Sequence, residues 1–322
     1  MQKNDEMKNI IVPILLIGFN RPHCIRKVMR QLEIIKPKSV YFSIDAPRKG
    51  KNEEELVKQV VDLVKNVNWD CTCHYRFHEQ NVGAEVNVST AISWVLEDNE
   101  CVIVNEDDIY ADYSFYKFIQ DMLIHYKDDN RIGLVTGLNL EPVSDNVKDD
   151  YYISRNGHIW GWGTWKRVWK NYCLHDEIKE ENLDIKLLEQ YYGSQAKAET
   201  TRAILLEQSK KGIGKVTWDY MFWYHRILYN YFAVVPNKNL VTNIGVEGLH
   251  ASGLALTHFT KRKRDYYVNE LLDFEQARKN EKLYLKPFRK RTIFIKIYDR
   301  VKLFLLKTFK YNNKFLTEFY NS

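Results

Sequence analysis

Short apolar runs alternate with amphipathic stretches through the first hundred residues. Residues 10–19 (IIVPILLIGF) form a continuous apolar run closed by a polar turn, which is typical of a buried parallel strand. Strands that alternate with helices in this way predict an α/β fold built on a parallel, doubly wound sheet. The expected strands are 10–19, 40–45 and 71–78, and the expected helices are 22–35, 52–67 and 83–98.

The next apolar run, Cys101 to Tyr110 (CVIVNEDDIY), ends in the acids Glu106, Asp107 and Asp108. Burying three unpaired carboxylates would cost several kcal/mol each, so these acids must lie at the end of a strand. Ligands of open α/β sheets bind beyond the carboxyl ends of strands. Carboxylates there suit Mn²⁺ or Mg²⁺ bridging the protein to nucleotide phosphates. The alternative is a solvated acidic turn that caps the following helix.

Two earlier strands also end in polar residues. Asn20 and Arg21 follow the first strand, and Asp45 ends the second. A strand-to-helix turn with these side chains predicts contact with a nucleotide, and the alternative is a plain corner between strand and helix. Pro22 lies near the first turn of the next helix, where its missing N–H does no harm.

The middle of the chain continues with a helix at 115–129 and a strand at 132–140. Residues 141–157 are polar and acidic and are expected to form a surface loop. Residues 157–172 (GHIWGWGTWKRVWKNY) hold four tryptophans, Trp162 among them, and three glycines. Glycines let a backbone approach a ligand closely, and indoles can line its groove. A tryptophan-rich corner of the core is the alternative.

Residues 176–212 form a charged helical region, and residues 215–236 form an aromatic run that resembles a buried helix. Asp219 is the one acid in this run. Its carboxylate is either paired with a base such as His225 or Arg226, or partly desolvated so that its basicity rises. Capping of the helix by Asp219 is the third interpretation.

A glycine-rich loop, 239–253, carries His250. Backbone N–H groups in such a loop can cradle a diphosphate, and an imidazole can ligate a metal or contact phosphate. A surface loop with no chemical role is the alternative.

The net charge of +6 is concentrated after Lys261, where basic clusters precede lysines interleaved with Phe, Leu and Ile. Such a tail favours an anionic surface. It is too charged to span a bilayer and is consistent with an interfacial helix, with a helix packed on the catalytic domain, or with a contact to a second subunit. The odd count of five cysteines matches no zinc or CxxC pattern, and the N-terminus shows no signal peptide. We therefore expect a cytoplasmic protein, with the tail on the inner face of the plasma membrane.

The order of these features resembles the glycosyltransferase-A fold, and within it the mannoside N-acetylglucosaminyltransferase I type and its bacterial nucleotide-diphospho-sugar transferase relatives. In that family a Glu-Asp-Asp motif precedes a Phe-containing helix, and Gly-Trp, Trp-Asp and late Gly-rich segments follow. The similar segments here are Glu106 to Asp108, Gly161 to Trp165, Trp218-Asp219 and Gly245 to Gly253. The resemblance spans residues 11–255 and implies a catalytic domain at 1–260 with a basic helical appendage at 261–322.

The resemblance implies an inverting glycosyltransferase that uses a nucleotide-diphosphate sugar, with a UDP-sugar favoured as donor. Asp108 would hold Mn²⁺ or Mg²⁺ with His250, and Asp219 would be the catalytic base, although the family's second consecutive Asp is Tyr220 here. The expected nucleotide-sugar contacts are Asn20, Arg21, Asp45, Glu106, Asp107 and Trp162. The expected acceptor is a glycan or a polyprenyl-linked sugar, and no nucleic acid is expected as a partner.

Two other classes of protein share part of this pattern. A sugar-nucleotide nucleotidyltransferase would have the same sheet and acids, but a Gly-rich basic loop usually follows its first strand, and Gly18-Phe19-Asn20-Arg21 is poor in glycine. A non-catalytic carbohydrate-binding or membrane-binding protein would account for the aromatic residues and the tail. It would give no reason for the three acids.

Overall fold

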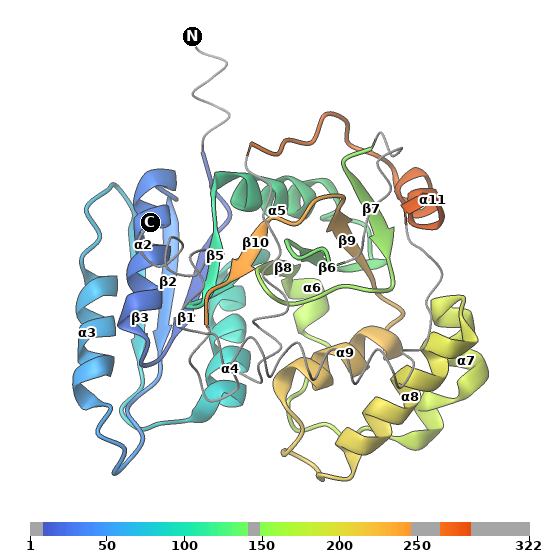
Figure 1. Ribbon diagram of the computed structural model, residues 1–322, viewed down its shortest axis with the longest axis horizontal. Helices are drawn as coiled ribbons and strands as arrows, with labels where there is room; N and C mark the ends of the chain where they lie inside the picture. The colour runs from blue at the N-terminus through green and yellow to red at the C-terminus, as the bar shows by residue number, and fades with distance from the viewer. Residues whose placement is uncertain (1–8, 141–148, 246–264, 285–322) are drawn as a thin grey trace, which may run out of the picture.

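The computed structural model describes residues 9–140, 149–245 and 265–284 (Figure 1). Its centre is an eight-stranded sheet of order β3-β2-β1-β4-β8-β6-β9-β7. The first four strands in this order are parallel to one another, as the alternating apolar runs predict. They are β1 (Ile14–Gly18), β2 (Ser39–Ile44), β3 (Thr72–Phe77) and β4 (Cys101–Glu106).

The second half of the sheet has mixed directions. β8 is antiparallel to both β4 and β6, whereas β9 is parallel to β6 and antiparallel to β7. The sheet is therefore mostly parallel with two reversed strands. The strands are β6 (Ile132–Thr136), β7 (Tyr151–Ser154), β8 (Trp162–Trp165) and β9 (Phe232–Pro236), and β5 (Ile109–Ala111) and β10 (Val241–Asn243) form a separate antiparallel pair.

Three expectations for this half are wrong. Residues 151–154, expected in a surface loop, form a fully buried strand, because β9 pairs with one edge of β7 and helix α11 packs against it. Residues 232–236 are a strand rather than the end of a helix. Residues 241–243 are paired with β5 rather than part of an open loop.

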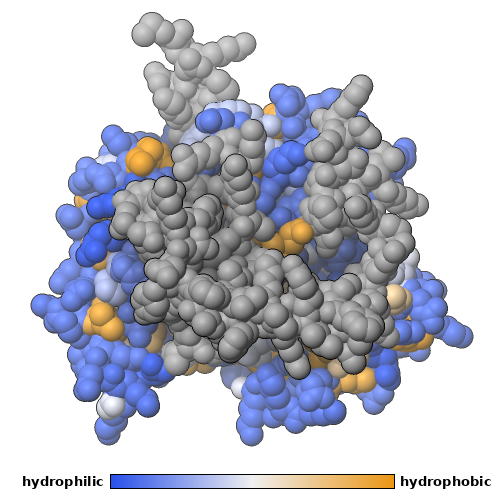
Figure 2. Space-filling model, viewed as in Figure 1, coloured by the Kyte–Doolittle hydropathy of each residue, from blue (hydrophilic) through white to orange (hydrophobic). Residues whose placement is uncertain are grey.

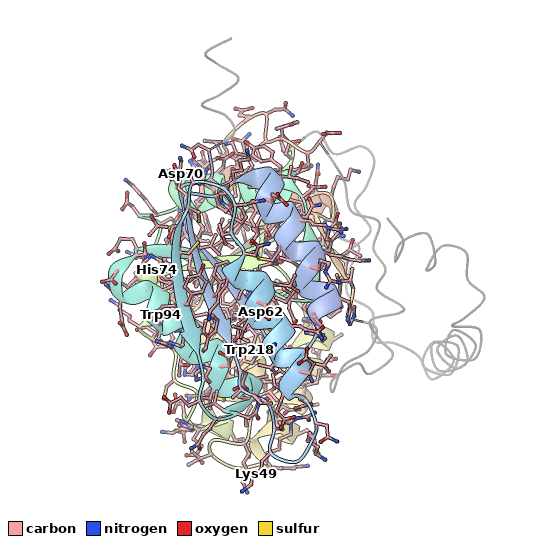
Figure 3. The ribbon with its side chains drawn as sticks, turned by 90° about the vertical axis from the view of Figure 1, so that its left-hand side faces the viewer. Lys49, Asp62, Asp70, His74, Trp94 and Trp218 are labelled. Carbon is pink, nitrogen blue, oxygen red and sulfur yellow. The ribbon has the colours of Figure 1, made fainter. Side chains whose placement is uncertain are left out.

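The helices cover both faces of the parallel half. The connections from β1 to β2 and from β2 to β3 run in one direction along the sheet, and the connection from β3 to β4 runs back. Right-handed crossovers in opposite directions place their helices on opposite faces, so α4 lies across the sheet from α2 and α3 (Figure 3). These helices are α2 (Pro22–Ile35), α3 (Glu54–Lys65) and α4 (Gly83–Asp98).

The remaining helices pack around the mixed half. α5 (Tyr113–His125) packs on β4, β6 and β8, and α9 (Trp218–Leu228) contacts α4 and α8. A second, smaller apolar cluster joins α7, α8 and α9. The others are α6 (Lys166–Trp169), the short 3-10 helix Glu180–Leu183, α7 (Ile185–Tyr192), α8 (Gln195–Ser209) and α11 (Phe274–Tyr284).

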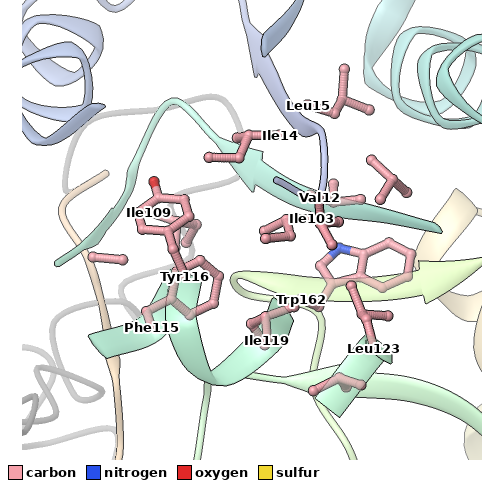
Figure 4. Packing of buried hydrophobic residues seen from close by; sticks show 14 of the residues in the cluster. Val12, Ile14, Leu15, Ile103, Ile109, Phe115, Tyr116, Ile119, Leu123 and Trp162 are labelled. Atoms are coloured by element: carbon pink, nitrogen blue, oxygen red, sulfur yellow. The ribbon is translucent and has the colours of Figure 1, made fainter. Parts of the chain in front are cut away.

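The main core lies where α5 packs on the middle of the sheet (Figure 4). Trp162 on β8 is completely buried there, and Phe115 and Ile119 of α5 belong to the same cluster. Gly163 permits this close packing, since a Cβ at that position would lie 2.7 Å from Ile119 Cγ2. The apolar sequence of β4 and the small residues of β8 together allow the helix to sit directly on the sheet.

The described part of the expected appendage packs on the same core. Tyr266, Leu272 and Phe274 are buried in it, and the carbonyl oxygen of Leu272 accepts a hydrogen bond of 2.9 Å from the hydroxyl of Tyr126. The predicted interfacial helix at residues 285–322 lies outside the described residues, and its membrane role stays a prediction. Within the described chain, no helix has the length and apolar character needed to cross a membrane. Among the described atoms visible in Figure 2, apolar residues are scattered over a mainly hydrophilic face.

Candidate functional site

The turns after β1 and β4 meet at one edge of the sheet. β1 and β4 are parallel neighbours, and the Asp107 N–H extends their pairing by donating to the carbonyl oxygen of Ile17 at 2.9 Å. From β1 the chain moves away to β2, whereas β4 lies on the other side of β1. A parallel sheet binds its ligands at such a reversal of strand order, beyond the carboxyl ends of the strands. Residues 19–21 and 107–108 are therefore at the position where a ligand is expected.

Arg21 joins the acids in this position. Its Nε donates to Asp107 Oδ2 at 3.2 Å, its Nη1 donates to Asp108 Oδ2 at 2.7 Å, and its Nη2 donates to Asp107 Oδ1. The side chains of Asp107, Asp108 and Arg21 are 3%, 14% and 23% exposed. Burial would lower the pKa of Arg21, but the charges of Asp107 and Asp108 outweigh burial and raise that pKa. Pro22 begins α2 directly after Arg21, so the guanidinium is attached to the first turn of a helix.

The charge of Asp219 acts on Glu106, the last residue of β4. Burial, and next the charge of Asp108, raise the pKa of Glu106 to about 8, and the charge of Asp219 contributes in the same direction. Asp219 lies in the first turn of α9, is partly exposed, and accepts a hydrogen bond from Thr217 Oγ1. The structure thus brings Asp219 into electrostatic range of Glu106. These residues are more than one hundred positions apart in the sequence.

The two bases considered as partners of Asp219 lie elsewhere. His225 Nε2 contacts Asp176 Oδ2 at 3.0 Å, and its Nδ1 contacts the carbonyl oxygen of Met221 at 2.8 Å. Arg226 donates to the carbonyl oxygens of Gly157 and Arg155, each at 3.2 Å. Neither base contacts Asp219, so its pairing with His225 or Arg226 is wrong, and its other two interpretations, a partly desolvated carboxylate and a helix cap, stay predictions.

Asp45 and Asn20 make contacts within the protein. Asp45 is buried, and its carboxylate accepts hydrogen bonds of 2.9 Å from the N–H groups of Val82 and Gly83. Asp45 thereby attaches the turn before α4 to the end of β2. Asn20 donates to Glu53 Oε1 at 3.0 Å, so it connects the turn after β1 to the start of α3. Both residues lie beyond strand ends as predicted, and both hold neighbouring turns in place.

Trp162 does not line a groove. Its indole has no exposed surface and stacks on Trp218 at a centroid distance of 6.0 Å. Trp162 therefore belongs to a tryptophan-rich corner of the core and not to a sugar-binding groove. A buried strand between β4 and β6 leaves no side-chain position there open to a ligand. His250, the second expected metal ligand, lies outside the described residues.

The sequence interpretation missed how closely Gly245 approaches the acids. The N–H of Ile244 donates to the carbonyl oxygen of Asp108 at 2.7 Å, which holds the end of β10 against the acidic turn. A Cβ on Gly245 would meet Asp108 Oδ2 and would lie 2.8 Å from Arg21 Nη1. The sequence signal for this close approach was Gly245 itself, the first glycine of the glycine-rich segment after β10.

A divalent cation fits this site only in part. Within residues 9–140, 149–245 and 265–284, no group of three or more His, Cys, Asp or Glu side chains is placed to hold a metal. Arg21 occupies both oxygens of Asp107 and one oxygen of Asp108. Asp108 Oδ1 is the one oxygen of the two carboxylates that Arg21 does not contact. Mg²⁺ and Mn²⁺ are often held by one or two carboxylates together with substrate phosphates, and one open carboxylate oxygen meets the lower limit of that pattern.

No known family model and no curated protein match this chain in sequence. Among solved structures, a mannosyltransferase from Pyrobaculum calidifontis in complex with GDP-Man and Mn²⁺ is 13% identical with a TM-score of 0.35, over 77% of this chain and 61% of that one. Mouse xyloside xylosyltransferase 1 is 10% identical with a TM-score of 0.35, over 70% of this chain and 84% of that one.

HddC from Yersinia pseudotuberculosis, complexed with GMP-PN, is 10% identical with a TM-score of 0.31, over 50% of this chain and 80% of that one. All three likenesses are low in identity and in TM-score, and what each of these proteins binds is a property of that protein.

Proposed function

We propose that this protein transfers a sugar from a nucleotide-diphosphate sugar to a hydroxyl acceptor. One observation carries the proposal: Arg21, Asp107 and Asp108 meet at the reversal of strand order, and the charge of Asp219 acts on the neighbouring Glu106. A cation and several carboxylates at this position match the needs of a diphosphate leaving group. A purely structural protein would have no need of so much charge in a half-buried position.

Each residue has a distinct role in this proposal. Arg21 and the first turn of α2 bind the diphosphate, because a guanidinium and a helix N-terminus both favour phosphate oxygens. Asp108 holds Mn²⁺ or Mg²⁺ through its open oxygen, and the bound ion supplies charge neutralisation of the leaving diphosphate. Asp107 keeps Arg21 in position.

Asp219 is proposed as the general base. Its carboxylate takes the proton of the acceptor hydroxyl while that oxygen attacks the anomeric carbon from the face opposite the leaving group, which inverts the anomeric configuration. The partial exposure of Asp219 and the effect of its charge on the pKa of Glu106 support this role. Glu106 then lies beside the sugar.

A UDP-sugar is the favoured donor, and a glycan or polyprenyl-linked sugar is the favoured acceptor. The acceptor proposal depends on the basic, aromatic C-terminal segment, because a cationic amphipathic helix binds anionic lipid surfaces. The proposed place of action is the inner face of the plasma membrane, where such an acceptor is held.

The test is a metal-dependent donor hydrolysis assay. The full chain is incubated with UDP-sugars and GDP-mannose in Mn²⁺, and release of nucleoside diphosphate is measured. We expect slow release that EDTA abolishes and that falls by about 100-fold or more in Asp108→Asn and Asp219→Asn, since removing a metal ligand or a general base has effects of this order. Asp62→Asn, an exposed carboxylate on α3, is the matched control and should leave the rate unchanged.

A parallel assay, in which a nucleoside triphosphate and a sugar phosphate replace the sugar nucleotide, separates the competing class of enzyme. A nucleotidyltransferase would consume a nucleoside triphosphate and a sugar phosphate and release pyrophosphate. Pyrophosphate release without any release of nucleoside diphosphate would overturn the proposed function. Full activity of Asp108→Asn would overturn the role assigned to that residue.

A further inference from the structure

The charge balance at the site depends on Arg21. This one guanidinium contacts three of the four carboxylate oxygens of Asp107 and Asp108. Asp107 is almost fully buried, and its backbone N–H is bonded to β1, whereas the side chain of Arg21 is 23% exposed. Arg21 is therefore the less enclosed partner of the pair.

A divalent cation alone meets two obstacles here. It finds one open oxygen, Asp108 Oδ1, and it lies a few ångströms from a guanidinium of the same sign. The first turn of α2, a helix of 14 residues, adds further positive potential beside Arg21. An anion meets the opposite situation, because the guanidinium and the helix N-terminus both attract it.

A diphosphate would remove both obstacles to binding of the cation. Its oxygens complete the coordination that one carboxylate oxygen cannot provide. They also offer Arg21 a bidentate partner of the same geometry as a carboxylate, so the guanidinium can leave Asp108 without losing its hydrogen bonds. Once Arg21 moves, Asp108 Oδ2 becomes available to the cation.

We propose that Arg21 is a built-in counter-cation that passes from Asp108 to the donor diphosphate, and that this exchange makes binding of the metal depend on binding of the nucleotide. This inference rests on the proposed function, because it assumes a diphosphate ligand. Arg21 is a positioning residue for the metal in this account, and a binding residue for the diphosphate.

The test measures Mn²⁺ binding directly, by electron paramagnetic resonance of the free ion, with UDP and GDP as probes. In the wild-type chain we expect Mn²⁺ to bind weakly without nucleotide and at least about tenfold more tightly with the better of the two nucleotides. By linkage, Mn²⁺ should raise the affinity for that nucleotide by the same factor. In Arg21→Gln we expect Mn²⁺ alone to bind several-fold tighter than in wild type, because three carboxylate oxygens are released. The nucleotide should then add little.

Two further variants frame this result. Arg48→Gln is the matched control, since Arg48 forms a similar pair with Glu53 in the neighbouring turn and should leave Mn²⁺ binding unchanged. Arg21→Lys keeps the charge but cannot span both acids, and it should fall between wild type and Arg21→Gln. Circular dichroism establishes that each variant is folded. The nucleotide dependence of Mn²⁺ binding in the wild-type chain tests the inference even if a variant fails to fold.

The outcomes separate this inference from the proposed function. Tight binding of Mn²⁺ to the wild-type chain without nucleotide would overturn the inference, as would equal nucleotide dependence in wild type and in Arg21→Gln. Either result leaves a nucleotide-binding enzyme. Failure of every chain to bind UDP or GDP with Mn²⁺ would overturn the proposed function together with this inference.

Discussion

Arg21 and Arg226 are both largely removed from solvent, but their guanidinium groups donate hydrogen bonds to different kinds of partner. Arg21 donates to the carboxylates of two acids, whereas Arg226, which is 2% exposed, donates to the backbone carbonyl oxygens of Gly157 and Arg155. The partners of Arg226 belong to the segment between β7 and β8, so a ligand cannot replace them without disrupting the fold. The partners of Arg21 carry full charges that another cation can take. A buried arginine thus indicates a binding site by the kind of partner it has, and burial alone does not.

The largest effect on stability is expected from the carbonyl-bound arginine. Arg226→Met leaves two carbonyl oxygens in the interior without donors, which should lower the free energy of unfolding by about 2–4 kcal/mol. Carbonyl groups do not titrate, so the loss should be the same at pH 6 and pH 8. Urea denaturation at both pH values measures it. Arg30→Met, an exposed residue of α2, is the control and should change stability very little. A loss from Arg226→Met that varies with pH would contradict the comparison.

The carboxylate-bound arginine should give a smaller loss that depends on pH. Burial raises the pKa of Asp107 to about 6 and that of Glu106 to about 8, and Arg21 acts against both shifts. An acid whose folded-state pKa is raised loses stabilisation as the pH rises from its unfolded pKa through its folded pKa. Without Arg21 the folded-state pKa values rise further, so the deficit of Arg21→Gln grows with pH.

We expect Arg21→Gln to lose about 1–3 kcal/mol at pH 8 and much less at pH 5, where both acids are mostly protonated in the folded state with or without Arg21. Urea titrations at pH 5, 6, 7 and 8 measure this dependence. A deficit that stays constant over that range would mean that the acids do not carry the charge that Arg21 balances.

The smallest effect on stability is expected at Gly245. In Gly245→Ala the new Cβ would lie 2.9 Å from Asp108 Cβ and 2.8 Å from Arg21 Nη1, so the acid or the arginine must shift. The free energy of unfolding should change by less than about 1 kcal/mol, because the site is at the sheet edge. Affinity for nucleoside diphosphate with Mn²⁺ should fall several-fold, as calorimetry would show. Ile244→Val keeps the backbone bond to Asp108 and is the control; equal affinity in both variants would remove Gly245 from the site.

The parallel half of the sheet was predictable from the sequence because its signals are local. β1 and β2 are short apolar runs, and amphipathic helices with one buried face follow them. The end of β4 was also predictable, since unpaired acids cannot continue into the interior. Glu106 is the last residue of that strand in the structure.

The mixed half depends on contacts between distant segments, which local patterns do not contain. Tyr151 lies on β7, in a polar and acidic part of the sequence, and its hydroxyl accepts from the N–H of Leu272, 121 residues away. The same limit applied to the site. The acids were identified by their residue type, but their pairing with Arg21, 86 and 87 residues away, follows from the order of strands in the sheet.

The small β5–β10 ribbon ties the acidic turn to the rest of the chain. β5 begins directly after Asp108, its partner β10 ends at Asn243, and the next residue, Ile244, is bonded to the Asp108 carbonyl. Any displacement of this turn by a ligand would therefore also shift Ile244 and the end of β10.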